Sequence, residues 1–152
     1  MARSLLTRSG VGTVAEILGE KGTAIHIAER RTSVFDAIQR MVAHKVGSLV
    51  VVDGGEPCGI VTERDYLKRV AAQGLDPTTT LVEEVMTAEV VCVRPSDTFD
   101  RCMALMTELR IRHLPVLADG RLVGLVSVGD LVKRQVLEQR IEIQYLTDYI
   151  TS

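Results

Sequence analysis

A duplication limits the fold of this chain more than any other feature of its sequence. Residues 32–69 recur 65 positions later as residues 97–134. Each copy contains the pattern Gly-h-h-[Thr/Ser]-x-x-Asp, where h is apolar, at residues 59–65 and 124–130. A chain of 152 residues has room for one ordinary domain or for two half-domains that share a core. The repeat favours the second arrangement, with a pair of similar polar sites.

Each copy predicts the same order of secondary structure. The apolar residues from Val34 to Val42 follow the spacing of one buried helix face, and those from Phe99 to Met106 repeat it. A β-type run, a two-residue turn and a second β-type run follow in each copy. Further predicted elements are extended segments at 24–28 and 90–93, and helices at 14–18, 66–70, 82–86 and 131–137.

These elements predict a division of the chain into a first repeat at 13–70, a linker at 71–79, a second repeat at 80–136 and a C-terminal helix at 137–152. In the last segment Leu137, Ile141 and Tyr145 recur at i+4 spacing. That spacing indicates either a helix packed on its own repeat or an oligomer contact. We expect the two copies to fold as one body about a pseudo-twofold axis.

Charge and composition narrow the classes of partner and the compartment. The net charge of −2 gives no overall basic field that would attract nucleic acid or an acidic membrane surface. No run of about 18 apolar residues predicts a membrane span. The 3 cysteines form no C-x-x-C pair, so neither a disulfide framework nor a zinc site is expected. We therefore predict a cytoplasmic protein with no nucleic-acid partner, no membrane partner and no metal site.

Three short segments carry a resemblance to a known family. They are Ser-Leu-Val-Val-Val-Asp at 48–53, Thr-Glu-Arg-Asp-Tyr at 62–66 and Arg-Ile-Arg-His-Leu-Pro-Val at 110–116. Together with the duplication they resemble a tandem pair of cystathionine β-synthase (CBS) domains, the regulatory unit called a Bateman module, in its short stand-alone bacterial form. The resemblance implies an α/β (α+β) fold of two pseudo-twofold-related repeats, each a small three-stranded sheet with packed helices. It also implies an adenosine-containing regulatory ligand, either AMP, ADP or ATP, or alternatively NAD or S-adenosylmethionine.

The Thr/Ser-x-x-Asp segments have two chemical interpretations. In the first, the hydroxyl and the carboxylate satisfy exposed backbone N–H groups at the start of a helix, as in a capping box. In the second, the helix start attracts a phosphate, the hydroxyl adds a donor and the Asp accepts from a cis-diol such as that of ribose. The resemblance implies the second role, with Asp65 and Asp130 on the ribose hydroxyls and Thr62 and Ser127 near ribose or phosphate.

Pro115 interrupts a predicted strand. Because proline has no backbone N–H to donate to a neighbouring strand, we expect it at a sheet edge. The resemblance implies that this edge lies against the adenine ring, and Val50 fills the matching place in the first copy.

Basic residues distinguish the two copies. Arg112 and His113 precede the strand of the second copy, whereas Gly47 and Ser48 occupy the matching positions in the first. The resemblance implies that Arg112 and His113 reach phosphate; the alternative is that they are solvated charges at a helix end. Arg64 is a further candidate phosphate ligand. We therefore predict two sites that are not equivalent.

The predicted function is a regulatory adenine-nucleotide sensor that binds its ligand in the cleft between the repeats, without enzymatic activity or a catalytic cofactor. The sequence contains no GxxxxGK[ST] phosphate loop and no recognisable catalytic arrangement. The alternative is a purely structural module for protein–protein interaction. We also predict a homodimer or a higher oligomer, and a regulated protein partner that the sequence does not identify.

Overall fold

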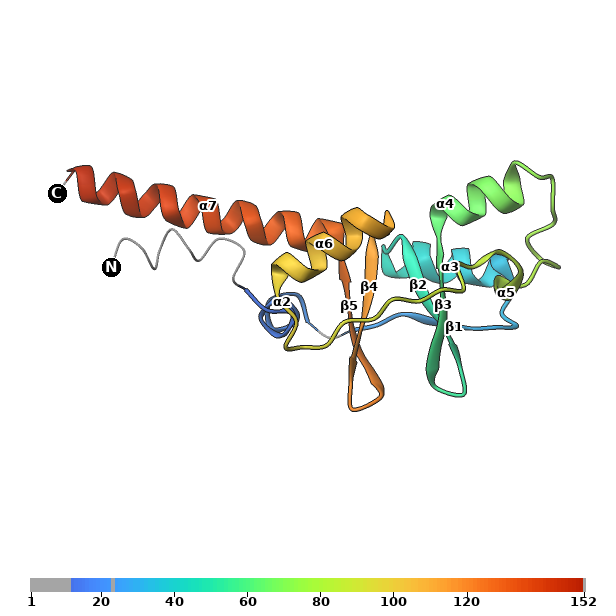
Figure 1. Ribbon diagram of the computed structural model, residues 1–152. Helices are drawn as coiled ribbons and strands as arrows, with labels where there is room; N and C mark the ends of the chain where they lie inside the picture. Colours follow the sequence, from blue (N-terminus) through green and yellow to red (C-terminus); the bar gives the residue numbers. More distant parts are fainter. Residues whose placement is uncertain (1–11, 23, 152) are drawn as a thin grey trace. The chain divides into compact units, whose positions relative to one another are not determined.

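The two copies fold into matching series of helices and strands, as Figure 1 shows. The computed structural model describes residues 12–22 and 24–151. Its elements, in chain order, are α2 (Val14–Lys21), β1 (Ile27–Glu29), α3 (Val34–His44), β2 (Ser48–Asp53), β3 (Glu56–Thr62), α4 (Glu63–Asp65), the π-helix η1 (Tyr66–Ala71), α5 (Val82–Val85), α6 (Phe99–Leu109), β4 (His113–Ala118), β5 (Arg121–Ser127) and α7 (Val128–Thr151). This mixture of helices and small sheets confirms the predicted α/β class.

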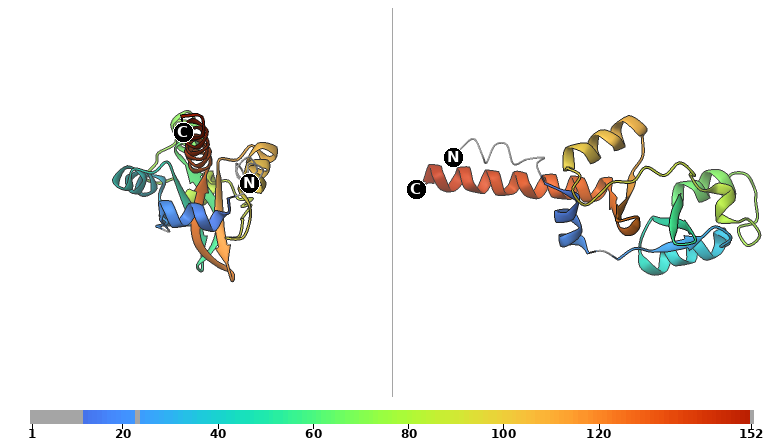
Figure 2. Two further views of the ribbon diagram at one scale, coloured as in Figure 1. Left: turned by 90° about the vertical axis from the view of Figure 1, so that its left-hand side faces the viewer. Right: turned by 60° about the horizontal axis from the view of Figure 1, so that its bottom comes forward.

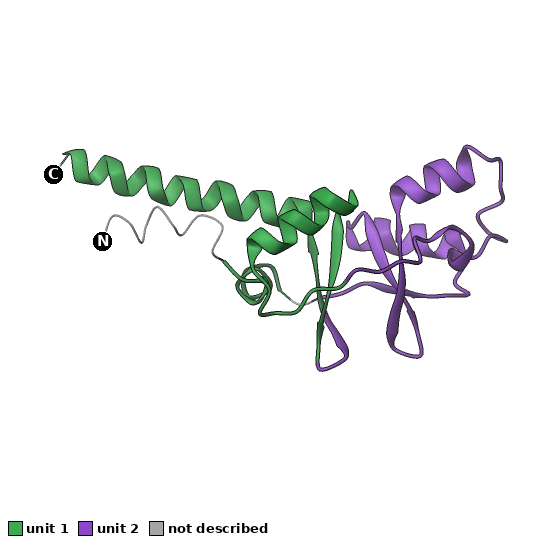
Figure 3. Cartoon of the chain, viewed as in Figure 1, with its two compact units in different colours: residues 1–23, 92–118, 124–152 green, residues 24–91, 119–123 purple. Residues whose placement is uncertain are grey.

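The chain forms two compact units, coloured separately in Figure 3. Within the described residues, unit 1 comprises 12–22, 92–118 and 124–151, and unit 2 comprises 24–91 and 119–123. Unit 2 therefore contains the sheet and helices of the first repeat together with α5. Unit 1 contains β4, residues 124–127 of β5 and the helices of the second repeat together with α2, whereas the hairpin turn and the start of β5 belong to unit 2.

The hairpin predicted in each repeat is confirmed. β2 pairs antiparallel with β3, and β4 pairs with β5. At the turns Gly54 and Gly55 have φ angles of 59° and 85°, and Asp119 and Gly120 have φ angles of 52° and 74°. Positive φ at both central residues is the geometry that matches the twist of a two-residue hairpin, and glycine adopts it without steric cost.

The strand predicted at 90–93 is wrong, and Pro115 gives the physical reason. In unit 2, β1 pairs parallel with β2, and the N–H of Val50 donates to the carbonyl of His26 at 3.3 Å. Pro115 takes the place of Val50 in the second repeat and has no N–H to donate. Only a single parallel bridge remains there, between Val93 and Val116. The second sheet is therefore two-stranded, where three strands were expected.

The helices α3 and α6 follow the predicted apolar spacing. Val34, Ala37 and Met41 are buried, and α6 buries the residues that correspond to them in the repeat. The expectation that Val42 lies on the same buried face is wrong, because Val42 is 73% exposed. Each helix then ends on a residue in the left-handed conformation, Lys45 or Arg110, both with φ of 55°. This ending turns the chain into the strand that begins each hairpin.

Each short helix ahead of a repeat packs on the sheet of the other repeat. α5 contacts β3 in unit 2, and in unit 1 Leu18 of α2 lies against Gly124 of β5. A Cβ added to Gly124 would lie 2.6 Å from Leu18 Cδ2. A Cβ added to Gly59 would collide with the Met86 side chain just beyond α5. The glycine that opens each Gly-h-h-[Thr/Ser]-x-x-Asp pattern therefore permits this close packing.

The helices after each hairpin differ in length and form. The segment predicted as a helix at 66–70 is a π-helix, η1, preceded by the single turn α4. The segments at 131–137 and 137–152, which were expected as separate helices, form one continuous helix, α7. α7 contacts α2 and α6 near its start, and the right-hand view of Figure 2 shows its C-terminal half continuing beyond them. Within the described residues, no helix is apolar over a length that could cross a membrane.

Candidate functional site

The Thr62-x-x-Asp65 segment forms a complete capping box at the start of α4. The backbone N–H of Asp65 donates to Thr62 Oγ1 at 3.2 Å. In return, Asp65 Oδ2 accepts from the Thr62 N–H at 2.9 Å and from the Thr62 hydroxyl at 3.1 Å. The capping interpretation of this segment is therefore confirmed.

The matching segment in the second repeat makes the same cap at the start of α7 and adds a cation. Ser127 Oγ accepts from the Asp130 N–H at 3.1 Å, and Asp130 Oδ2 accepts from the Ser127 N–H at 2.8 Å. The ammonium of Lys21, at the end of α2, lies 2.7 Å from Asp130 Oδ2 and 2.8 Å from the carbonyl oxygen of Leu125. Asp130 is therefore part of both a helix cap and an ion pair.

Capping leaves part of each carboxylate open. In Asp65 and in Asp130 all the bonds described above are made by Oδ2, and Oδ1 accepts none from the described residues. Burial opposes ionisation of Asp130, but hydrogen bonds from Lys21 and from the Ser127 N–H outweigh it and hold the pKa of this carboxyl below its usual value. Asp130 is thus ionised near neutral pH, with one oxygen available to accept from a ligand hydroxyl.

The predicted basic residues of the second repeat lie beside Asp130 in unit 1. The Arg112 carbonyl accepts from the Val128 N–H at 2.9 Å, which joins the start of β4 to the start of α7. Burial lowers the pKa of His113, and the positive charges of Lys21 and Arg112 lower it further, against the opposing charge of Asp130. The Arg112 side chain is exposed and that of His113 is partly buried.

The start of α7, next to these residues, has one backbone N–H group without a hydrogen-bond acceptor among the described residues. The N–H groups of Val128 and Asp130 are occupied by the Arg112 carbonyl and by Ser127 Oγ. The intervening N–H of Gly129 donates to no other group of the described chain. Pro115 is buried within β4, one residue beyond Leu114, and its carbonyl accepts from the Val93 N–H at 2.9 Å.

The corresponding residues of the first repeat lie together in unit 2 and have a different charge. The Gly47 carbonyl accepts from the Glu63 N–H at 3.0 Å, the counterpart of the bond between Arg112 and Val128. The Glu63 carboxylate lies over Gly47, with Oε1 3.5 Å from the position a Cβ would take. Ser48 and Val50 are buried in β2. Arg64 is exposed and forms no ion pair within the described part of the chain.

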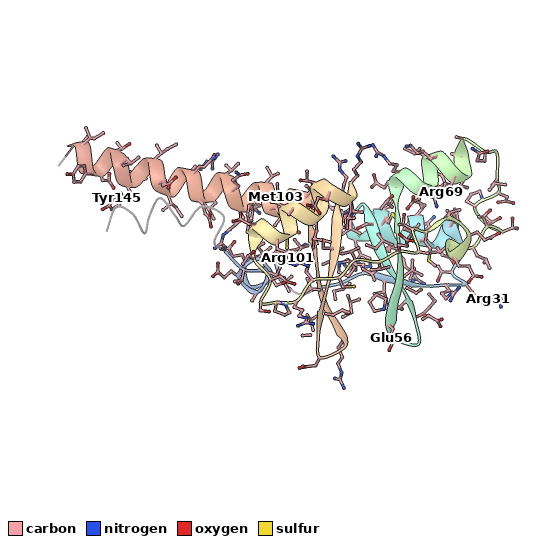
Figure 4. The ribbon with its side chains drawn as sticks, in the orientation of Figure 1. Arg31, Glu56, Arg69, Arg101, Met103 and Tyr145 are labelled. Atoms are coloured by element: carbon pink, nitrogen blue, oxygen red, sulfur yellow. The ribbon has the colours of Figure 1, made fainter. Side chains whose placement is uncertain are left out.

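Three cations that the structure places near these motifs were not predicted as functional. Lys21 lies 109 positions from Asp130 along the chain, and no sequence pattern connects them. Arg134 pairs with Glu16 of α2 at 2.8 Å and with a second α2 carboxylate at 2.6 Å. Its counterpart Arg69, labelled in Figure 4, donates to the Val85 carbonyl at the end of α5 at 2.9 Å. The recurrence of this arginine in both copies was the sequence signal that could have predicted its role. Arg134 binds α2 in unit 1, and Arg69 binds the end of α5 in unit 2.

The described residues include no cluster of three or more His, Cys, Asp or Glu side chains arranged to hold a metal ion. The remaining donors and acceptors around Asp130 are a carboxylate oxygen, a hydroxyl, a backbone N–H and three cationic or titratable side chains. Such a set can bind a polyhydroxylated anion, because the carboxylate accepts from hydroxyl groups while the cations and the N–H attract negative charge.

Comparisons with known proteins identify the repeats. The family model described as "CBS domain" matches residues 14–72 and 82–137. The CBS domain-containing protein CBSX3, mitochondrial, of Arabidopsis thaliana is 46% identical over 123 residues, which are 78% of this chain and 60% of the relative. The chain thus spans less than two thirds of that relative's length. A solved structure of a protein with CBS domains from Burkholderia ambifaria MC40-6 is 51% identical, covers 84% of this chain and 96% of that one, and has a TM-score of 0.80.

Of two further solved structures, one is a complex with ligands and the other is a hexamer. The CBS domain pair of protein MJ0100, in complex with 5-methylthioadenosine and S-adenosyl-L-methionine, is 27% identical with a TM-score of 0.69, and the match covers 81% of this chain and 94% of that one. The hexameric CBS-CP12 protein from bloom-forming cyanobacteria is 33% identical with a TM-score of 0.73, and the match covers 80% of this chain and 71% of that one.

Proposed function

This chain belongs to the CBS domain family, and we propose that it is a regulatory sensor whose second repeat binds an adenosine-containing anion at Asp130. CBS-domain proteins of this kind are regulatory modules without catalytic activity, and no catalytic family is indicated for the chain. The observation that carries the proposal is the ionised Asp130 carboxylate, which keeps Oδ1 open beside Lys21, His113 and Arg112.

In the proposed complex, Asp130 Oδ1 accepts a hydrogen bond from a ribose hydroxyl while Oδ2 continues to cap α7. A cap and a diol ligand can therefore coexist, because they use different oxygens of one carboxylate. Phosphate is attracted by Arg112, by the Gly129 N–H at the helix start and by His113. The base is proposed to lie near Pro115 of β4.

Lys21 has a specific part in this proposal. Its ammonium lies 2.7 Å from Asp130 Oδ2 and balances the charge of that carboxylate. The ribose hydroxyl binds Oδ1 and leaves this ion pair in place, while a phosphate on the same ligand is attracted by the Lys21 ammonium. Neutral adenosine gives no such attraction, so Lys21 favours charged nucleotides over adenosine.

We propose AMP, ADP or ATP as the ligand, and S-adenosylmethionine and NAD as the competing candidates. The complex of MJ0100 supports the adenosine moiety that all of these share. The cationic side chains around Asp130 favour the nucleotides, because S-adenosylmethionine carries a positive sulfonium where the nucleotides carry phosphate.

We propose that ligand binding changes the geometry or the oligomeric state of the module, and that a regulated protein recognises this change. A ligand can shift such an equilibrium only by its difference in affinity for the two states. We propose a homodimer as the assembly, with a higher oligomer as the alternative supported by the hexameric CBS-CP12 protein.

Thermal unfolding with a panel of ligands tests this function. A ligand at 100 times its dissociation constant adds about 2.7 kcal/mol to the free energy of unfolding, a shift of several degrees. We expect AMP, ADP or ATP to give this shift, and 2′,3′-dideoxyadenosine nucleotides to give much less. If no adenosine compound stabilises the protein, the caps are only structural and the module serves protein–protein interaction. Equal shifts for ribose and dideoxyribose would contradict the role of Asp130.

A further inference from the structure

One side of α7 carries apolar side chains that are exposed, from its second turn to its C-terminal end. The exposed fractions are 49% for Val132, 41% for Val136, 63% for Ile143, 50% for Leu146 and 80% for Ile150. Figure 4 draws the side chains of the C-terminal half of α7, around the labelled Tyr145, with no other described helix or strand against them. A row of large apolar side chains on one helix indicates a surface that binds a partner.

These five residues form a straight seam along the helix. With Gln139 they follow spacings of four and three in alternation, from Val132 to Ile150. At about 100° per residue, all six lie within about 40° of one line along the helix. The stripe at Leu137, Ile141 and Tyr145 advances by four residues each time and so drifts around the helix by about 40° per step. The seam has the heptad geometry of a coiled coil, and the i+4 stripe does not.

We propose that the seam pairs with the same seam of a second copy in a parallel, in-register, two-stranded coiled coil. Its a positions are Val136, Ile143 and Ile150, all β-branched, and Leu146 occupies a d position. β-Branched residues at a together with leucine at d favour two parallel strands over larger bundles.

Gln139 determines the register. In the parallel arrangement each Gln139 faces Gln139 of the second copy, and the two amides donate and accept across the seam. In an antiparallel arrangement of the same length, Gln139 would face Ile143 and its amide would be buried without a partner. The polar residue therefore disfavours both the antiparallel orientation and a shift by one heptad.

The charges beside the seam select the same orientation. In a parallel pair, Arg140 lies next to Gln135 of the second copy and Glu142 lies next to Thr147, so no like charges meet. In the antiparallel pair, Arg140 would face Arg140 and Glu142 would face Glu142. The coiled coil thus identifies the second copy as the partner of α7. It rests on the homodimer of the proposed function and requires no ligand.

Sedimentation equilibrium of the full-length chain tests the seam. We expect a dimer for the natural sequence and a loss of about 100-fold in association for Ile143→Lys, since each copy contributes roughly a tenfold loss from one apolar residue. Ile141→Lys is the matched control, because Ile141 is 59% exposed on the opposite side of the same helix. It should leave association unchanged. Leu146→Lys repeats the test at another position of the seam.

A monomeric natural chain, or equal effects of Ile143→Lys and Ile141→Lys, would overturn the proposal. The nucleotide-induced thermal shift separates it from the proposed function. If the Ile143→Lys monomer keeps this shift, the seam serves assembly only. If the shift is absent in both proteins while the natural chain is dimeric, the ligand assignment fails and the seam stands.

Disulfide cross-linking tests the orientation. Ile150→Cys places two thiols face to face in the parallel pair and far apart in the antiparallel pair, so oxidation should give a covalent dimer of Ile150→Cys alone. The parent chain gives the baseline, because burial raises the pKa of Cys102 to about 11 and also raises the pKa of Cys58 and Cys92. Cross-linking only in a mixture of Ile150→Cys with Val132→Cys would show the antiparallel pair and overturn the parallel one.

Discussion

The two repeats build the same helix cap and place it in opposite electrostatic surroundings. Asp130 of the second repeat lies beside Lys21, His113 and Arg112. Asp65 of the first repeat forms no ion pair among the described residues, and the Glu63 carboxylate lies nearby over Gly47. The backbone and the cap were thus kept in both copies, while the side chains around them diverged. A repeated motif therefore defines a local geometry, and its neighbours decide what it attracts.

Among the cationic side chains, the largest effect is expected at Arg112. Arg112→Ala should weaken AMP binding by about 1.5–3 kcal/mol, because a charge-assisted bond to phosphate is lost, and should change adenosine binding little. Arg64→Ala is the control in the first repeat and should leave AMP affinity unchanged. Isothermal titration with both ligands measures the difference, and an equal loss for adenosine and AMP would contradict the assignment.

The packing of α2 against β5 should respond to one added methyl group. Gly124→Ala brings a Cβ to 2.6 Å from Leu18 and should lower the free energy of unfolding by about 1–3 kcal/mol. Leu18→Ala in the same chain removes the collision, so the double variant should lose less than the sum of the two single losses. Strict additivity in urea unfolding would contradict the contact.

His113 should make the second site dependent on pH. Its pKa is lowered in the fold, so the unfolded chain binds the proton more readily and the free energy of unfolding falls as pH drops below about 6.5. A bound phosphate favours the charged imidazole, so the ratio of AMP affinities for the natural chain and His113→Gln should rise roughly 3- to 10-fold between pH 8 and pH 5.5. Using the ratio cancels the titration of AMP itself. A flat ratio would remove His113 from the phosphate site.

The smallest effect is expected at Lys21. Lys21 is partly exposed, so its pair with Asp130 contributes less than about 1 kcal/mol. Lys21→Met should therefore lower AMP affinity by about 2- to 5-fold at most and change adenosine affinity little. An equal loss for both ligands would show that Lys21 does not attract the phosphate.

Much of the fold could be predicted from sequence because it depends on local signals. The apolar spacing of α3 and α6 and the glycine turns act within a few residues of the chain. Two expectations were wrong for local reasons. Pro115 removes the donor that a third strand needs, and no helix-breaking residue separates 131–137 from the segment that follows.

The non-local part of the site could not be predicted in the same way. The caps at Thr62 and Ser127 follow from the motif itself. The ion pair between Lys21 and Asp130 depends on α2 packing with the second repeat, and no pattern in the sequence specifies that exchange. The roles of Arg112 and His113 remain predictions that the titrations above address.

Isothermal titration of AMP into three proteins tests the central claim, that only the second repeat carries the nucleotide site. The natural chain should bind one AMP per chain with high affinity. Asp130→Asn should abolish this binding, whereas Asp65→Asn should leave its affinity and stoichiometry unchanged, and thermal unfolding of both variants controls for damage to the caps. Two equivalent sites in the natural chain, or equal losses from the two substitutions, would contradict the account.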